Sequence, residues 1–316
     1  MPNYQGVWNI STQYQNRDGW PVFVPLNNRG VFGGGMGDSG ANQTTIDYVE
    51  ITTLGNATDF GDLTVGRRQL AAASSITRGL FAWGEASSGN TNVIDYITIA
   101  SAGNATDFGD MSSGAKTNCT GASNETRAIL GGGQSTSYQY VTIATTGNSA
   151  TFGTSILTSS QNRGRAGCSS PTRAIFAGGD SASNVIEYFT IDTLGNGTDF
   201  GDLTQSRGNF AGASNATRGL FFGGETYNII DYITIASTGN ATDFGDLSSA
   251  RQSVGATANE TRALAAGGRD SEYRNYIEYV TIGTTGNSVD FGDLTLTAFD
   301  RYRLAGLSGA HGGLQV

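Results

Sequence analysis

The chain has 316 residues, of which 47 are glycine and only four are proline, and its net charge is −9 with a single lysine, Lys116. Because nucleic-acid backbones are bound through clustered Lys and Arg, this balance argues against a nucleic-acid partner. No apolar run reaches the roughly 18 residues that a spanning helix needs, so we expect no membrane insertion.

Residues 1–28 form an N-terminal arm that lies outside the repeated part of the chain. The arm is rich in large apolar side chains for its length. These are Tyr4, Trp8, Tyr14, Trp20 and Phe23. Buried aromatic residues are frequent anchors of protein interfaces, so the arm is a candidate docking segment for a partner subunit. Folding back onto the rest of the chain is an equally good interpretation.

From residue 29 onward, one pattern recurs six times. Its clearest part is NATDFGDL at 56–63, whose central Phe returns every 44 to 48 residues. The tripeptide Asp-Phe-Gly holds magnesium in protein kinases, but a kinase also needs a glycine loop, a phosphate-pairing lysine and a catalytic loop. An active-site tripeptide is needed once, so five copies and a degenerate sixth, NSATFGTS at 148–155, indicate architecture. The period suits a propeller blade of four short strands.

Each repeat divides into four predicted strands, shown here for the fifth. A small, Ala/Gly-rich strand at 209–214 is expected nearest the axis, where large side chains do not fit. An apolar strand follows at 218–224, and a β-branched strand at 231–236. Gly and Asn then turn the chain into the fourth strand, at 242–247.

The two ends of the chain predict how the array closes. The first repeat has no inner strand before residue 29, whereas residues 303–310 have the composition of an inner strand with no second strand after them. We therefore expect residues 303–310 to complete the blade begun by residues 29–63. The predicted fold is all-β, a closed six-bladed propeller over residues 29–316 without exposed inner edges.

The repeats resemble the kelch repeat. An apolar strand ends in Gly-Gly, a Tyr opens the next strand, and a large aromatic follows twelve residues later. The pairs are Tyr48/Phe60, Tyr96/Phe108, Tyr140/Phe152, Tyr188/Phe200, Tyr232/Phe244 and Tyr279/Phe291. The chain has Phe where kelch usually has Trp, and Ala82-Trp83-Gly84 replaces one Gly-Gly ending.

The pattern GVWNI…QYQ…W of the arm, followed by these repeats, resembles virion proteins of tailed phages, especially phages of cyanobacteria. The resemblance implies a structural, tail- or fibre-associated protein of the virion, made in the host cytoplasm. It implies other virion or tail proteins as partners, in a symmetric assembly, and possible contact with host surface polysaccharide.

Other motifs favour structural interpretations. The paired carboxylates, such as Asp59/Asp62, are expected to accept turn amides or to pair with Arg. The Asn-x-Ser/Thr sequences are expected to be turns, and Cys119 and Cys168 buried thiols. The segment GDSG around Ser39 resembles a serine-protease nucleophile, for which His311 is the one available base. We expect no enzyme, no catalytic residue, no metal and no cofactor; a glycosidase or lyase on the propeller scaffold remains the alternative.

The loops between the second and third strands differ in every repeat. Equivalent loops of a propeller emerge on one face, and binding residues concentrate on such loops. We expect them to contact a glycan or a protein. The candidate binding residues are Asp38, Asn42, Asn90, Asn92, Asp180, Tyr227, Arg269, Tyr273 and Arg274.

Overall fold

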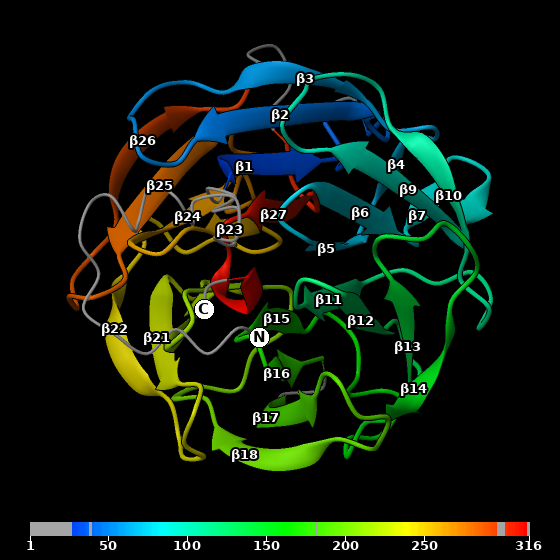
Figure 1. The fold of residues 1–316 in the computed structure, drawn as a ribbon. Helices are drawn as coiled ribbons and strands as arrows, with labels where there is room; N and C mark the ends of the chain where they lie inside the picture. The colour runs from blue at the N-terminus through cyan, green and yellow to red at the C-terminus, as the bar shows by residue number, and fades with distance from the viewer. Residues whose placement is uncertain (1–26, 38–39, 181–182, 296–300, 315–316) are drawn as a thin grey trace, which may run out of the picture.

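A computed structural model of the chain describes residues 27–37, 40–180, 183–295 and 301–314. The described part is all-β: six four-stranded antiparallel sheets and one small three-stranded sheet. The six sheets stand around a common centre (Figure 1), an arrangement compatible with a propeller. None of the helices in these ranges has the length and apolar character needed to cross a membrane.

The strands are given from the centre outward. Sheet 1 contains β27 (Ala305–Gly309), β1 (Asn27–Gly33), β2 (Thr45–Glu50) and β3 (Thr58–Asp62). Sheet 2 contains β5 (Ala71–Ser74), β6 (Arg78–Ala82), β9 (Val93–Thr98) and β10 (Thr106–Asp110). Sheet 3 contains β11 (Cys119–Ser123), β12 (Arg127–Gly132), β13 (Ser137–Thr142) and β14 (Ala150–Thr154). Sheet 4 contains β15 (Ala166–Ser169), β16 (Arg173–Gly179), β17 (Ser183–Thr190) and β18 (Thr198–Asp202).

Sheet 5 contains β19 (Ala211–Ser214), β20 (Arg218–Phe222), β21 (Ile229–Thr234) and β22 (Thr242–Asp246). Sheet 6 contains β23 (Gly255–Ala258), β24 (Arg262–Ala266), β25 (Tyr276–Thr281) and β26 (Val289–Asp293). The small sheet contains β4 (Arg67–Arg68), β7 (Glu85–Ala86) and β8 (Gly89–Asn90). The last described element is a 3-10 turn, η2 (Gly312–Leu314).

The C-terminal strand pairs with the first strand of the chain, as predicted. β27 lies antiparallel to β1, with Val31 opposite Leu307. Around the centre, each inner strand contacts the inner strands of both neighbouring sheets. β1 begins at Asn27 and so includes the last two residues of the predicted arm. The predicted docking residues of the arm lie outside the described residues. They are Tyr4, Trp8, Tyr14, Trp20 and Phe23.

The repeated NATDFGD segment connects neighbouring sheets through hydrogen bonds, and we call this connection the clasp. Gly103 donates its backbone N–H to the carbonyl of Phe60 (2.7 Å), and Ala105 donates to the carbonyl of Asp62 (2.8 Å). Between them, the Asn104 Oδ1 accepts the backbone N–H of Asp62 (3.0 Å). The same bond is made by Asn56, Asn104, Asn148, Asn196, Asn240 and Asn287. Each copy thus covers part of the preceding sheet's outer edge, which explains why the chain needs six copies.

Glycine inside this clasp is required by both conformation and space. Gly201 has a φ of +145°, and a Cβ on it would lie 2.4 Å from the carbonyl oxygen of Gly239 in the next sheet. We expect Gly201→Ala to lower the free energy of unfolding by about 1–3 kcal/mol, because it adds backbone strain to a steric clash.

Gly195→Ala is the matched control for that substitution. A Cβ on Gly195 meets no atom within 4 Å, so its effect is expected to stay within about 0.5 kcal/mol. Urea unfolding followed by circular dichroism measures both variants. Equal losses would show that the clasp has no special need for glycine.

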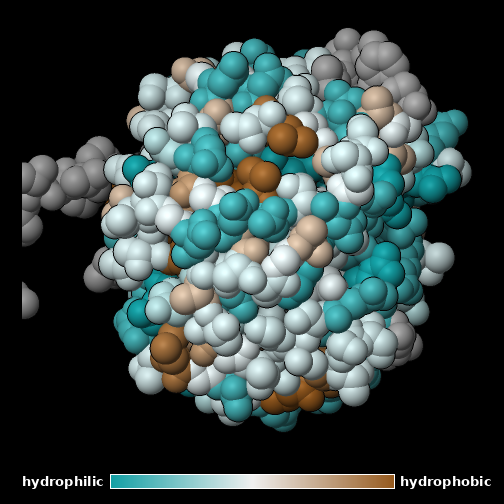
Figure 2. All heavy atoms as spheres, turned by 90° about the vertical axis from the view of Figure 1, so that its right-hand side faces the viewer, coloured by the Kyte–Doolittle hydropathy of each residue, from teal (hydrophilic) through white to brown (hydrophobic). Residues whose placement is uncertain are grey.

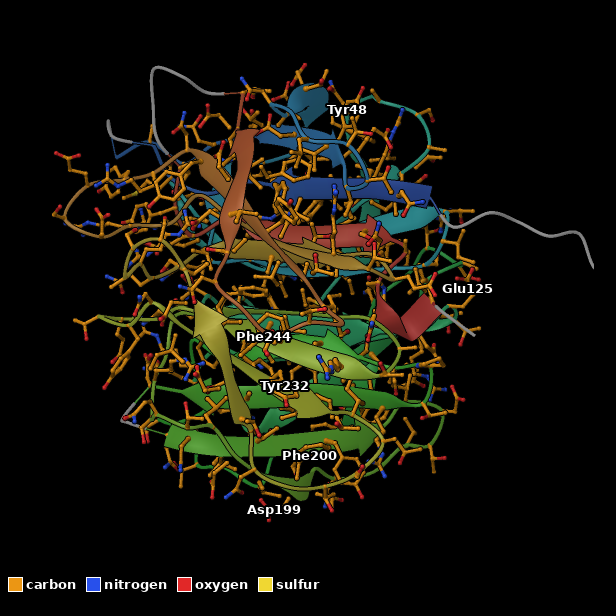
Figure 3. The ribbon with its side chains drawn as sticks, turned by 90° about the vertical axis from the view of Figure 1, so that its left-hand side faces the viewer. Tyr48, Glu125, Asp199, Phe200, Tyr232 and Phe244 are labelled. Atoms are coloured by element: carbon orange, nitrogen blue, oxygen red, sulfur yellow. The ribbon has the colours of Figure 1, made fainter. Side chains whose placement is uncertain are left out.

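In the outer half of each sheet, an arginine of the second strand packs on the third-strand Tyr, and that Tyr contacts the fourth-strand Phe. In sheet 5, the Arg218 guanidinium lies 4.8 Å from the ring centroid of Tyr232, and Tyr232 meets Phe244 edge-on at 5.8 Å. The Arg218 Nη1 donates to the carbonyl of Ile282 in the next sheet (2.9 Å). Both rings come from the outer two strands of the sheet (Figure 3). The predicted Tyr/Phe pairs therefore pack together. The arginine that packs on the Tyr also connects two neighbouring sheets through its hydrogen bond.

Buried ion pairs connect the segments that lead into the inner strands with the third strands. Their arginines and acids are nearly fully buried, and the described pairs are Arg67–Asp95, Arg165–Glu187, Arg207–Asp231, Arg251–Glu278 and Arg301–Asp47. This corrects the expectation for the paired carboxylates of the fourth strand. Asp59 is exposed, and Asp199 lies at the outer rim (Figure 3). In five of the six sheets, the arginine pairs instead with the buried acid immediately before the third-strand Tyr.

The remaining structural predictions concern turns, thiols and the surface. Asn124, Asn215 and Asn259 each accept the backbone N–H of the residue three positions later, which confirms the turn interpretation. Cys119 and Cys168 are buried free thiols, as expected. Hydrophobic residues appear only as separate small groups on the face in Figure 2, so that face offers no large apolar patch.

Candidate functional site

The loops between second and third strands lie beside the segments that lead into the inner strands. The backbone N–H of Gly84 bonds to the carbonyl of Lys116 (3.0 Å), and that of Gln134 bonds to the carbonyl of Asn162 (3.3 Å). We call this end of the sheets the variable-loop face. The opposite face carries η2 and the turn that contains Glu125 (Figure 3).

The predicted binding residues are spread over this face and do not converge on one site. Asn42 donates to the carbonyl of Glu85 (2.8 Å), and Asp180 lies 3.4 Å from Arg163. Asn92 and Tyr227 are half-buried. Asp38 lies outside the described residues. Of the predicted set, Asn90 alone lines the largest cavity described below.

A second group forms in the loop of sheet 6. Tyr273 stacks on Tyr302 with ring centroids 4.5 Å apart, and the Arg269 guanidinium lies 5.3 Å from the Tyr273 ring centroid. Arg274 is held by Asp270 (2.9 Å) and by Glu272. The charged and aromatic groups of this loop therefore satisfy one another, which favours loop packing over ligand binding.

A polar cavity of about 380 Å³ opens where the loops of sheets 2 and 3 meet the segment leading into sheet 4. Its polar lining residues are Asn90, Lys116, Thr117, Gln134, Ser135 and Arg163. No carboxylate belongs to this lining. The predicted set missed Lys116, Gln134 and Arg163. One signal was available in the sequence. Lys116 lies three residues before Cys119, the first residue of the inner strand of sheet 3, and the equivalent position in sheets 1, 2, 5 and 6 is a buried arginine.

The ammonium of Lys116 is buried and has no hydrogen-bond partner among the described residues. It lies 5.1 Å from the ring centroid of Trp83, which is itself fully buried. Burial lowers the pKa of Lys116, and the nearby Cys119 thiol opposes that shift. The cation therefore rests on an aromatic face, and Lys116 belongs to the lining of a cavity that has no acidic counter-ion.

The centre of the molecule offers little room. Inner-strand serines donate their hydroxyls to carbonyls of the neighbouring inner strands, and cavities of about 50 and 90 Å³ remain along the axis. The serines that make these bonds are Ser74, Ser123, Ser169, Ser214 and Ser308. These volumes hold water-sized molecules, so the axis is not a passage for a substrate.

His311 closes one end of this axis. Its Nδ1 accepts the backbone N–H of Gly313 (3.1 Å), and its Nε2 lies 3.1 Å from the carbonyl oxygen of Ser74. These partners fit a neutral imidazole with its proton on Nε2. Burial lowers the pKa of His311 to about 4. The predicted partner Ser39 lies outside the described residues, and the contacts of His311 are structural.

The buried histidine makes stability depend on pH. The unfolded chain takes up a proton near pH 6.5, whereas the folded His311 resists protonation down to about pH 4. The part of the free energy of unfolding that depends on a neutral His311 is fully present above pH 6.5. It is lost as the pH falls toward 4, by at most about 3 kcal/mol. We expect His311→Gln to lose less stability than the wild type between pH 7 and pH 5, measured by urea unfolding. Parallel losses in both proteins would contradict this assignment.

Within the described residues, no group of three or more His, Cys, Asp or Glu side chains is placed to hold a metal ion. Comparison with known proteins adds no assignment. No protein-family model matches the chain, and no curated protein matches it.

Proposed function

We propose that this protein is a non-enzymatic component of a phage particle, associated with the tail or a fibre. Residues 1–28 dock it onto other virion proteins, and the variable-loop face contacts host surface polysaccharide. The scaffold is a six-bladed kelch-type propeller in which each four-stranded sheet is one blade. The particle assignment is supported by the resemblance of the arm and repeats to phage virion proteins.

Ring closure is supported by contacts between sheets 6 and 1 that copy those between other neighbours. Gly55 donates its N–H to the carbonyl of Phe291 (2.9 Å), as Gly103 does to Phe60. The Arg262 Nη1 donates to the carbonyl of Ile51 (3.1 Å), as Arg218 does to Ile282. A closed ring presents its equivalent loops on one rigid face, which suits binding.

One observation carries the binding role: the polar cavity of about 380 Å³ lies among the loops that differ between repeats. Its volume is within the range of roughly 300–1,000 Å³ that is common for small-ligand sites. Amide and hydroxyl groups on its wall match the hydroxyl groups of sugars. The repeated strands form a rigid framework, and the variable loops carry the side chains that would contact a ligand.

Two measurements test the proposal. Mass spectrometry of purified particles is expected to detect the protein. Deletion of residues 1–26, which leaves β1 intact, is expected to remove it from particles without abolishing polysaccharide binding. The full chain is expected to bind purified host polysaccharide without releasing new reducing ends. Absence from particles would overturn the virion assignment, and released sugar ends would favour the carbohydrate-active enzyme.

A further inference from the structure

We propose that the cavity at Lys116 binds a carboxylate-bearing sugar, a uronic acid residue of a polysaccharide. Lys116 and Arg163 would recognise the carboxylate, while the amides and hydroxyls of the wall would recognise the ring hydroxyls. This inference rests on the proposed polysaccharide binding and adds to it the charge of the ligand.

Sheet 3 departs from the repeat at the position of the buried ion pair. In the other five sheets, a buried arginine pairs with the acid that precedes the third-strand Tyr. Sheet 3 has Gln139 in place of that acid. Gln139 is already satisfied, since its Oε1 accepts from Ser112 (2.7 Å) and its Nε2 donates to Ser137 (3.0 Å). Sheet 3 has thus lost its acid but kept a cation, Lys116, at the position of the arginine.

Leaving the Lys116 cation without a partner is energetically costly. A buried ion pair that loses both charges is often as stable as before, but a buried charge left without a partner is strongly destabilising. The Lys116 ammonium has no hydrogen-bond partner among the described residues. Arg163, across the cavity, lies 3.4 Å from the Asp180 carboxylate, so its charge is partly compensated. A bound anion would compensate Lys116, and a planar carboxylate also suits a guanidinium.

The rest of the cavity wall is polar, which suits the hydroxyl groups of a sugar ring. Asn90 and Gln134 carry amides, and Thr117 and Ser135 carry hydroxyls, all on the cavity wall. The wall offers no exposed aromatic or large aliphatic side chain, which disfavours an apolar peptide segment. Backbone hydrogen bonds from Gly84 and Gln134 hold the surrounding loops in place. The site is therefore largely formed before a ligand arrives, which reduces the ordering cost of binding.

The test compares D-galacturonate with D-galactose, which differ at C6, where one has a carboxylate and the other a hydroxymethyl group. Isothermal titration of the full chain is expected to show at least tenfold tighter binding of galacturonate, weakening with added salt. Lys116→Met is expected to reduce galacturonate affinity toward the galactose level, because it removes the charge beside Trp83 and keeps an apolar side chain there, while Arg163 retains its charge. Its thermal midpoint, expected to be unchanged or higher, confirms that it folds.

The matched control is Arg269→Gln, which removes an exposed cation from another loop of the same face. It is expected to leave galacturonate binding unchanged, whereas Arg163→Gln is expected to weaken it. Equal affinity for galactose and galacturonate would overturn the inference. Acetate or sulfate binding as tightly as galacturonate would also overturn it, because a simple anion site would then explain the data.

The inference and the proposed function fail in different ways. Host polysaccharide that binds equally well to the wild type and to Lys116→Met, with no galacturonate preference, would overturn the inference and leave the proposed function standing. Galacturonate binding that depends on Lys116, in a protein absent from particles, would support the inference and overturn the virion assignment.

Discussion

Deleting residues 303–316 is expected to abolish cooperative unfolding and to cause aggregation. The deletion removes β27, whose Leu307 is buried, together with the preceding buried Leu304. It also exposes the inner edge of β1 as an unpaired strand, and such edges promote association between chains. The expected loss is about 5 kcal/mol or more, which is comparable with the total stability of many domains.

Thermal circular dichroism and light scattering measure this effect. Deletion of residues 312–316 is the control, because it removes η2 but keeps β27. We expect the control protein to remain monodisperse with a sharp transition at a lower temperature. A 303–316 deletion that melts as sharply as the parent, and stays monodisperse, would show that the pairing of β27 with β1 is not needed for the fold.

Asp231→Asn is expected to destabilise the protein by about 3–5 kcal/mol, because it leaves the buried Arg207 without its counter-ion. Both side chains are fully buried, with the Arg207 Nη1 2.8 Å from an Asp231 carboxylate oxygen. Asp231 also accepts from the Thr204 hydroxyl (2.6 Å) and backbone N–H (3.2 Å). The substitution retains the size of the side chain, so the effect reports mainly on charge.

Asp243→Asn, in the same sheet, is the matched control. Asp243 is exposed, so its loss is expected to stay within about 0.5 kcal/mol in urea unfolding. The double variant Asp231→Leu with Arg207→Met is expected to recover most of the lost stability, because no charge then remains buried. Similar losses for Asp231→Asn and Asp243→Asn would show that the buried pair is not a major contributor.

The strands were largely predictable because their signal is local. Alternating β-branched residues, a Gly-Gly ending and an Asn-Gly turn are read within a few residues. The fourth predicted strand of repeat five, at 242–247, corresponds closely to β22. The pairing of β27 with β1 was also predictable, since counting the strand types left one of each unpaired at the two ends.

The partners of charged groups were not predictable in the same way. The paired Asp residues of the fourth strand are the most regular acids of the repeat. They were therefore expected to accept turn amides or to pair with Arg, but Asp59 faces solvent. The acids that matter for burial, such as Asp95, are inconspicuous neighbours of the third-strand Tyr. Which face of a strand is turned to the interface depends on how the sheets pack, and this decides which acid meets arginine.

The candidate cavity was likewise only partly predictable from the sequence. Loop variability pointed to Asn90 but also to Tyr273, whose ring is occupied by Tyr302. Lys116 and Arg163 lie 47 residues apart in the sequence, outside the loops between the second and third strands. They line one cavity because the segments entering sheets 3 and 4 are neighbours at the variable-loop face.

By itself, the sequence determined the all-β class, the six repeats and the pairing of the tail strand with the first strand, because these follow from local periodicity and from counting. Only the tertiary structure decided which side chains share a buried interface and where a cation is left without an acid. Those relations depend on the packing between neighbouring sheets, which brings together residues whose separation along the chain carries no local signal.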